Sequence, residues 1–362
     1  MQQHDNPLLA EAQRQFLICS ACRYCESYCA TFPAIEGRTE YTAADTAYIA
    51  NVCHDCRACF QACMYTAPHE FAVDIPKLLA DVRLETYQTK GLRGISTAGI
   101  GVLVAAILFA AMVATGRWPL LGIATDAPGA FYRIVPFLWM LVPALALSLW
   151  ALVALCGMAR QLIRDVAPKA RATFADVVGA WKDGLNLTYM KGGGDGCYYP
   201  AITAPSHVRR VLHLTLVAGV GLAFLATVAA AFMQDVLEQL PPYPLLSVPV
   251  ISGTLGGVCI LMGAAGLLIL KTVRTAKNLD NDGMLKLELI FLWTLLAVAA
   301  TGLLLLVFRG TPFLGLLLVV HLATVATLFI TAPYGKFVHV PLRLAALLVF
   351  RMEEARGRGE SS

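Results

Sequence analysis

The sequence predicts a mostly α-helical protein in two parts, a small polar domain followed by a bundle of six transmembrane helices. Of the 362 residues, 58% are hydrophobic and only 14% are charged, whereas soluble domains carry roughly a quarter charged residues. Eight of the eleven cysteines fall within residues 1–90, together with many acids and bases. Beyond residue 95 the chain consists largely of long uncharged runs. This composition argues against an ordinary soluble enzyme.

Six stretches without any Asp, Glu, Lys or Arg are long enough to cross a bilayer, which takes about 20 apolar residues. They cover residues 95–115, 134–158, 211–233, 248–270, 289–308 and 313–334. With the N-terminus inside, basic residues concentrate in the inner loops and the C-terminal tail, and the outer side keeps only Arg117, Arg133 and Arg309. The positive-inside rule then places both termini in the cytoplasm. The net charge of +4 follows from this topology, so we expect no nucleic-acid partner.

Two cysteine clusters near the N-terminus repeat one pattern. "CSACRYCESYC" (19–29) and "CHDCRACFQAC" (53–63) both read C-x2-C-x2-C-x3-C. In bacterial two-cluster ferredoxins with this spacing, the fourth cysteine of each run binds the other cluster. The reason is the short distance that one loop can span. Three closely spaced thiolates wrap one face of a cubane, and its fourth corner points away from their loop. The pattern predicts two [4Fe–4S] clusters, one held by Cys19, Cys22, Cys25 and Cys63, the other by Cys53, Cys56, Cys59 and Cys29.

Zinc and disulfides are the alternatives for these cysteines. Zinc sites usually take two cysteines from each of two separated knuckles, and disulfides are disfavoured in a reducing cytoplasm. The proline that commonly follows the fourth cysteine is displaced to Pro33 and Pro68. The linker "TEYTAADTAYIANV" looks helical, and no alternating strand pattern appears. We therefore expect an α-helical ferredoxin-like domain. Cys197, in the loop "GGGDGCYYP", receives no assigned role.

Histidines near the membrane segments indicate a second kind of cofactor, because ligating residues in spans are usually functional. His321 and His339 are 18 residues apart, so one continuous helix would carry both on one face, about 27 Å apart. His339 would then lie near the inner side, at the depth of His213, where the third span begins. Two facing imidazoles at one depth can bind a six-coordinate b-type haem. The alternative is a set of interfacial histidines that bond to backbone or water.

This arrangement resembles the membrane cytochrome b subunit of respiratory nitrate reductases over the last four helices. The resemblance is carried by "LHLTLVAGVGLAF", "GTLGGVCILMGAAGLLILK" and "HLATVATLFITAPYGKFVH". It implies that His213 and His339 are the axial ligands of an inner haem. An outer haem would need His321 and a histidine at position 223, which is Ala223 here. His321 and His207 are left as possible contacts of haem or quinone.

The whole chain is similar to the tricarballylate utilisation protein B family (TcuB, also CitB). Its markers are the eight-cysteine domain, "GGGDGCYYP", "PSHVRR" and "PYGKFVH". The resemblance implies a membrane protein of the bacterial inner membrane that holds iron–sulfur clusters and haem b. Such a protein reoxidises the reduced flavin of a partner FAD-containing dehydrogenase, a TcuA-like tricarballylate dehydrogenase on the cytoplasmic side, and reduces quinone. A related architecture occurs in CobZ-type proteins of cobalamin synthesis.

These observations predict three regions. Residues 1–90 form a cytoplasmic two-cluster iron–sulfur domain, residues 91–345 a six-span domain with a cytoplasmic loop at 159–210, and residues 346–362 a basic tail. No Rossmann fingerprint for NAD or FAD occurs, so the dehydrogenase is expected to be another polypeptide. The function so predicted is electron transfer, in tricarballylate use or with another flavoprotein. A membrane redox sensor, which would need no haem, is the alternative from a different class.

Overall fold

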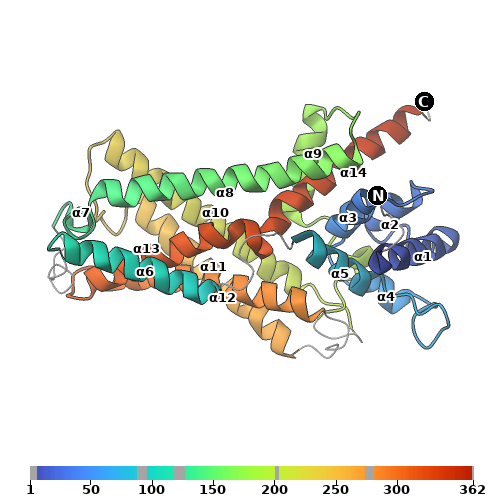
Figure 1. The fold of residues 1–362 in the computed structure, drawn as a ribbon, viewed down its shortest axis with the longest axis horizontal. Coiled ribbons are helices and arrows are strands. Elements are labelled where there is room, and N and C mark those ends of the chain that lie inside the picture. Colours follow the sequence, from blue (N-terminus) through green and yellow to red (C-terminus); the bar gives the residue numbers. More distant parts are fainter. Residues whose placement is uncertain (1–5, 88–95, 118–126, 200–203, 274–280, 361–362) are drawn as a thin grey trace.

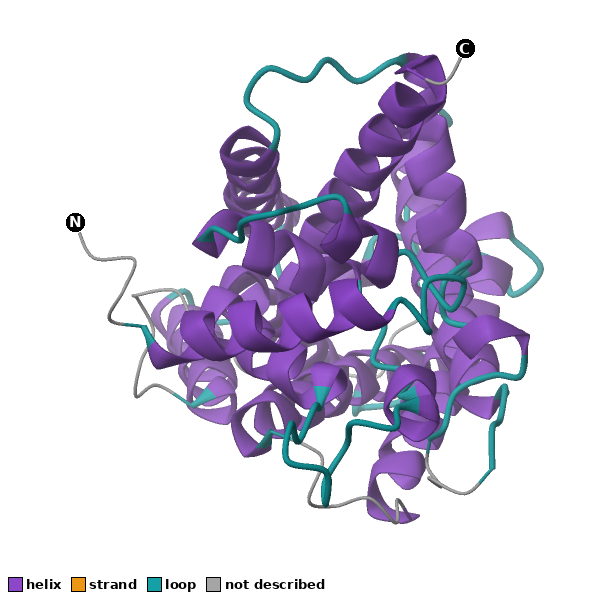
Figure 2. Cartoon of the chain, turned by 90° about the vertical axis from the view of Figure 1, so that its right-hand side faces the viewer, coloured by secondary structure: helices purple, strands orange, loops and turns teal. Residues whose placement is uncertain are grey.

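The cysteine-rich domain lies at one end of an elongated molecule, and the long apolar helices run away from it (Figure 1). The computed structural model describes residues 6–87, 96–117, 127–199, 204–273 and 281–360. These residues form helices and loops, with no strand among them (Figure 2). The predicted fold class, an α-helical ferredoxin-like domain followed by six spans, is confirmed. The predicted domain boundary at residue 90 lies outside the described residues.

Five short helices build the cysteine-rich domain. They are α1 (Pro7–Cys22), α2 (Thr31–Glu36), α3 (Ala43–Val52), α4 (Ala58–Ala62) and α5 (Ile75–Tyr87). Local signals fix their ends. Thr42 and Asp45 form a reciprocal capping box at the start of α3, which satisfies backbone donors that would otherwise lack partners. Buried apolar side chains such as Phe16, Tyr48 and Leu79 pack these helices together.

Six helices of the described chain are long and apolar enough to cross a membrane. They are α6 (Thr97–Ala114), α8 (Phe137–Val166), α10 (Val208–Asp235), α11 (Val248–Val273), α12 (Asp282–Val307) and α13 (Leu314–Thr331), the last span extending to Tyr334. Many of their large apolar side chains are exposed, for example Val102, Phe224 and Val307. Apolar exposure over whole helices is what contact with lipid requires. Two short helices, α7 (Ala130–Ile134) and α9 (Phe174–Asn186), lie in the connections.

Helices α10 and α11 pack backbone to backbone. A Cβ added to Gly219 would lie 2.7 Å from the backbone nitrogen of Ile260, and one added to Gly256 would lie 2.8 Å from that of Ala223. No side chain larger than hydrogen fits at either position without movement. Small residues permit this close approach of helices in lipid, where packing rather than water exclusion drives association.

The chain breaks its helix between His321 and His339. Helix α13 ends at Thr331, and two short 3-10 turns, Ala332–Tyr334 and Lys336–Val338, precede α14 (His339–Glu360). Pro333 lacks a backbone donor, and Gly335 is extended (φ −123°, ψ −164°). The expectation of one continuous helical face carrying both histidines is therefore wrong. They lie on different helices, with His339 beyond the last span.

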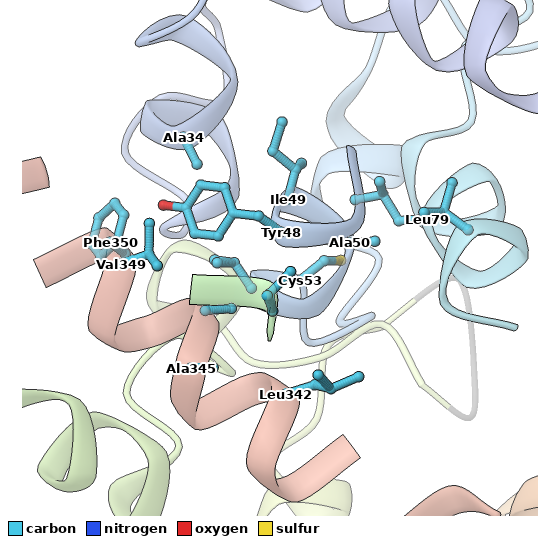
Figure 3. Close-up of a cluster of buried hydrophobic side chains, with 14 of the residues drawn as sticks. Ala34, Tyr48, Ile49, Ala50, Cys53, Leu79, Leu342, Ala345, Val349 and Phe350 are labelled. Carbon is cyan, nitrogen blue, oxygen red and sulfur yellow. The ribbon is translucent and has the colours of Figure 1, made fainter. Parts of the chain in front are cut away.

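Residues 346–360 of the predicted basic tail are instead part of α14, which returns to pack against the cysteine-rich domain. Figure 3 shows Val349 and Phe350 of this helix beside Tyr48 of α3, all buried. Polar contacts reinforce the apolar ones. Arg38 bonds to Glu353 at 2.6 Å, and the Tyr48 hydroxyl donates to Glu353 at 2.8 Å. The first and last segments of the chain therefore share one core, and the proposed boundary at 345/346 has no structural counterpart.

Candidate functional site

The first cysteine quartet lines a pocket at the end of α1. Cys19, Cys22, Cys25 and Cys63 face this space. Cys22 is exposed, whereas the other three thiols are partly covered. Burial raises the pKa of Cys19 and Cys25 to about 12, with the neighbouring Cys63 as the next cause. Because only thiolates bind metal strongly, a bound cation must displace the thiol protons here.

The second quartet lies deeper in the molecule than the first, and two of its thiols, Cys53 and Cys56, are buried. Cys29, Cys53, Cys56 and Cys59 line this pocket. Positive φ angles at Asp55 (52°) and Arg57 (63°) turn the backbone sharply between the cysteines. Cys63 thus lies with the first run and Cys29 with the second, which is the interleaving that the spacing predicts. Ligation itself remains a prediction.

The donor geometry suits a cluster. Among the described residues, no three His, Cys, Asp or Glu side chains converge as the ligands of a single ion would. A cubane makes a different demand, because each thiolate binds its own iron atom at a separate corner. Four thiols that face one space without converging on a point meet that demand.

The loop "GGGDGCYY" (192–199) covers the second quartet. A Cβ added to Gly192, where φ is +54°, would lie 2.9 Å from the Ala58 side chain and 3.8 Å from the Cys56 sulfur. The Tyr198 backbone N–H donates to the Cys56 carbonyl at 2.8 Å. Cys197 is fully buried, and its backbone pairs with that of Ser206. We conclude that Cys197 packs the loop and that glycine is needed at position 192 for the positive φ and for the close approach to Ala58.

A cavity that is partly open to solvent lies directly beyond the second quartet, and His54 and Arg57 line the spaces at both. His213, at the start of α10, and His339, at the start of α14, both line it. Their ring centroids are 6.4 Å apart with an interplanar angle of 82°. Nδ1 of His339 bonds to the Lys336 carbonyl, which can only accept, so the lone pair of the neutral ring is on Nε2. Burial holds the pKa of His339 well below its usual range, so the ring stays neutral.

The cavity is strongly cationic on the side of the cysteine-rich domain. Its basic lining residues are Arg57, Arg83, Arg209, Lys271, Lys336 and Arg343. Two carboxylates among the lining residues oppose them. Glu288 bonds to Lys271 and, at 2.9 Å, to Lys336, whereas Asp55 pairs with Arg57 and Arg209. The spans contribute apolar side chains, among them Leu216, Leu267 and Phe291. An amphipathic ligand with acidic groups would fit this lining.

The other candidate histidines lie elsewhere. His207 caps the start of α10, is exposed, and does not line the cavity. Nδ1 of His321 lies 3.0 Å from the hydroxyl of Thr301, and a Cβ added to Gly302 would lie 3.1 Å from the same ring. His321 thus faces α12. Ala223 belongs to the close contact of α10 with α11.

Sequence reasoning missed His54 and the basic residues of the cavity. His54 is buried, its Nδ1 donates to the Val52 carbonyl at 3.0 Å, and its Nε2 has no hydrogen-bond partner among the described residues. Its ring lines the cavity. The sequence offered one sign of this location, because His54 directly follows the predicted cluster ligand Cys53. Arg83, Arg209 and Lys271 of this set also mark the inner side of the membrane in the sequence, and no local pattern separates the two roles.

Comparisons with known proteins cover nearly the whole chain. Residues 12–89 match the family "Citrate utilization protein B Fer4-like domain", and residues 93–360 match the family "Citrate utilization protein B". A protein named Citrate utilization protein B, from Escherichia coli, is 39% identical over 361 residues, which is 96% of this chain and 93% of that protein. No solved structure matches. With both of its parts matched in order, the chain belongs to the Citrate utilization protein B (CitB/TcuB) family.

Proposed function

We propose that this protein is the membrane electron-transfer subunit of a flavoprotein dehydrogenase. It reoxidises the reduced flavin of the partner through two [4Fe–4S] clusters and one b-type haem and delivers the electrons to quinone. One observation carries the proposal. The second cysteine quartet and the cavity of His213 and His339 are contiguous, since His54 and Arg57 line the spaces at both. Electron carriers placed there would be close neighbours, with no mobile segment needed between them.

The cavity fits haem b in three respects. A metal held by two imidazole nitrogens at about 2 Å each has ring centres roughly 6 Å apart, which agrees with the observed 6.4 Å. The hydrogen bond from Nδ1 of His339 to a carbonyl leaves Nε2 available for iron. Basic side chains meet the two propionates, and apolar side chains meet the macrocycle. When bound, haem supplies a one-electron carrier, and this chain holds it with His213 and His339.

We expect a single haem. His321 is engaged by Thr301 on α12, and position 223 lies against α11. The pair that a second haem would need is therefore not assembled. His321 remains a candidate contact for quinone, because its Nε2 can still take part in a hydrogen bond.

The first quartet is the expected entry point for electrons, because it is the more exposed of the two. Cys22 is exposed there, and the neighbouring Tyr24 and Met64 are 58% and 64% exposed. Aromatic side chains and methionine are enriched where proteins dock. A cytoplasmic FAD-containing dehydrogenase can approach this end of the molecule, whereas the second quartet is covered. From the resemblance to the TcuB family, we expect that partner to be a tricarballylate dehydrogenase. Both termini then lie in the cytoplasm and the spans in the bacterial inner membrane.

Anaerobic spectroscopy combined with quinone reduction tests the proposal. The protein in detergent should show a broad iron–sulfur absorbance and sharp haem b bands, with one haem per chain. Its haem should be reduced by the reduced partner flavoprotein and reoxidised by a soluble quinone. Clusters without haem would instead favour a redox sensor, and a colourless protein kept free of oxygen would favour zinc. Reduction by a cobalamin-pathway flavoprotein but not by tricarballylate dehydrogenase would reassign the pathway.

A further inference from the structure

Two arginines from distant parts of the chain converge on one backbone carbonyl of the second quartet. Arg83 of α5 donates from Nη1 to the Cys53 carbonyl at 3.3 Å and to the Ala50 carbonyl at 2.9 Å. Arg343 of α14 donates from Nη2 to the same Cys53 carbonyl at 2.7 Å and from Nε to Asn51 at 3.2 Å. Both guanidinium groups therefore lie beside the backbone of a predicted cluster ligand.

Neither guanidinium has a carboxylate partner among the described residues. Arg83 is only 3% exposed. Asp55, which faces the same region, is already in ion pairs with Arg57 and Arg209. Arg343 is partly buried. Two guanidinium cations placed side by side in this way are costly unless an anion lies near them.

A cluster in the second quartet supplies that anion. An oxidised [4Fe–4S] core with four thiolates carries a net charge of about −2, and one-electron reduction makes it more negative by one unit. Nearby positive charge stabilises the reduced form more than the oxidised form. The first quartet differs, because the charged neighbour acting on Cys19 is the carboxylate of Glu36.

We propose that Arg83 and Arg343 are positioning residues that raise the reduction potential of the second cluster above that of the first. The inference rests on the proposed function. An electron taken from the flavin by the exposed first cluster is then transferred to the buried second cluster, which gains the electron that the first one loses. Because Arg343 lies in α14, its contribution to the difference in potential exists only when α14 is packed against the cysteine-rich domain.

Redox titration of the full-length protein, followed by electron paramagnetic resonance, tests this inference. The signal of the second cluster is identified as the one altered by Cys56→Ser. Arg83→Gln and Arg343→Gln should each lower the equilibrium constant for reduction of that cluster about tenfold, a shift of about 59 mV for one electron. The reduction potential of the first cluster should change by only a small fraction of this shift.

Arg343→Lys is the matched variant, because it keeps the charge but cannot make the same pair of hydrogen bonds. Its second cluster should titrate close to that of the unaltered protein. Intact clusters with unmoved potentials in both glutamine variants would overturn the inference, as would an equal shift of the two clusters. Absence of cluster signals from the unaltered protein would instead overturn the proposed function, so the two failures can be told apart.

Discussion

The two halves of the membrane bundle place their histidines in different surroundings. At the inner end, His213 and His339 line a cavity that also has six basic side chains in its lining. Towards the outer side, His321 bonds to Thr301, and position 223 lies against α11. A histidine in a span is therefore not by itself evidence of a cofactor. The difference lies in what faces Nε2 of the ring and in whether space and counter-charge accompany it.

The largest expected effect is loss of haem. His213→Ala and His339→Ala should each abolish haem binding, because an axial ligand is removed, while both clusters persist in the cysteine-rich domain. His321→Ala is the matched control, and it should retain the full haem content. Haem per chain is measured from the spectrum of the extracted pigment, and iron is measured separately. If His321→Ala lost as much haem as the other two variants, the proposed difference between the inner and outer halves would be contradicted.

Helix packing should account for the next largest effect. Gly219→Ala should destabilise the bundle by about 1–3 kcal/mol, because the added methyl meets the backbone of α11. Gly221→Ala, two residues away on the same helix, is the control, since a Cβ there meets nothing within 4 Å. Thermal unfolding in one detergent compares them. Equal midpoints would mean that α10 and α11 are not in close contact.

A smaller effect is expected at the bond between Thr301 and His321. Thr301→Val keeps the shape of the side chain but removes the hydroxyl, which should cost about 1 kcal/mol with haem content unaltered. Thr294→Val, on the exposed face of the same helix, removes a hydroxyl that bonds only to its own helix. This control should unfold like the parent protein. A loss of haem in Thr301→Val would show that the outer half also contributes to a haem site.

No gain at all is expected from restoring the second histidine. Ala223→His supplies the residue that a second haem would need, but this position lies in the contact between α10 and α11. Haem per chain should stay at one. A rise to two, with a second midpoint in a redox titration, would show that only the missing histidine separates the two halves.

Local features of the sequence were sufficient for much of this architecture. Uncharged runs located the six spans because solvation by lipid acts on each segment independently. The cysteine spacing predicts two groups of four thiols because the reach of a short loop is a local property; in the structure each group lines one space, and Cys59 lines both. The helix break before His339 was missed, although Pro333 and Gly335 stand in the sequence. The cavity was also missed, since it forms from residues as distant as His54, Glu288 and Arg343. Hydrophobic periodicity describes a single helix or strand, so it carries no information about contacts between segments that are far apart in the sequence.

The packing of α14 on α3 has a consequence for how the protein is made. The cysteine-rich domain leaves the ribosome first, yet Tyr48 is covered by Phe350 and bonded to Glu353, more than 300 positions later. A chain that stops before α14 leaves this surface bare and lacks Arg343 beside Cys53. Translation of all six candidate spans therefore precedes completion of the core of the cysteine-rich domain. Helix α14, the last to be translated, thus completes the domain that is translated first.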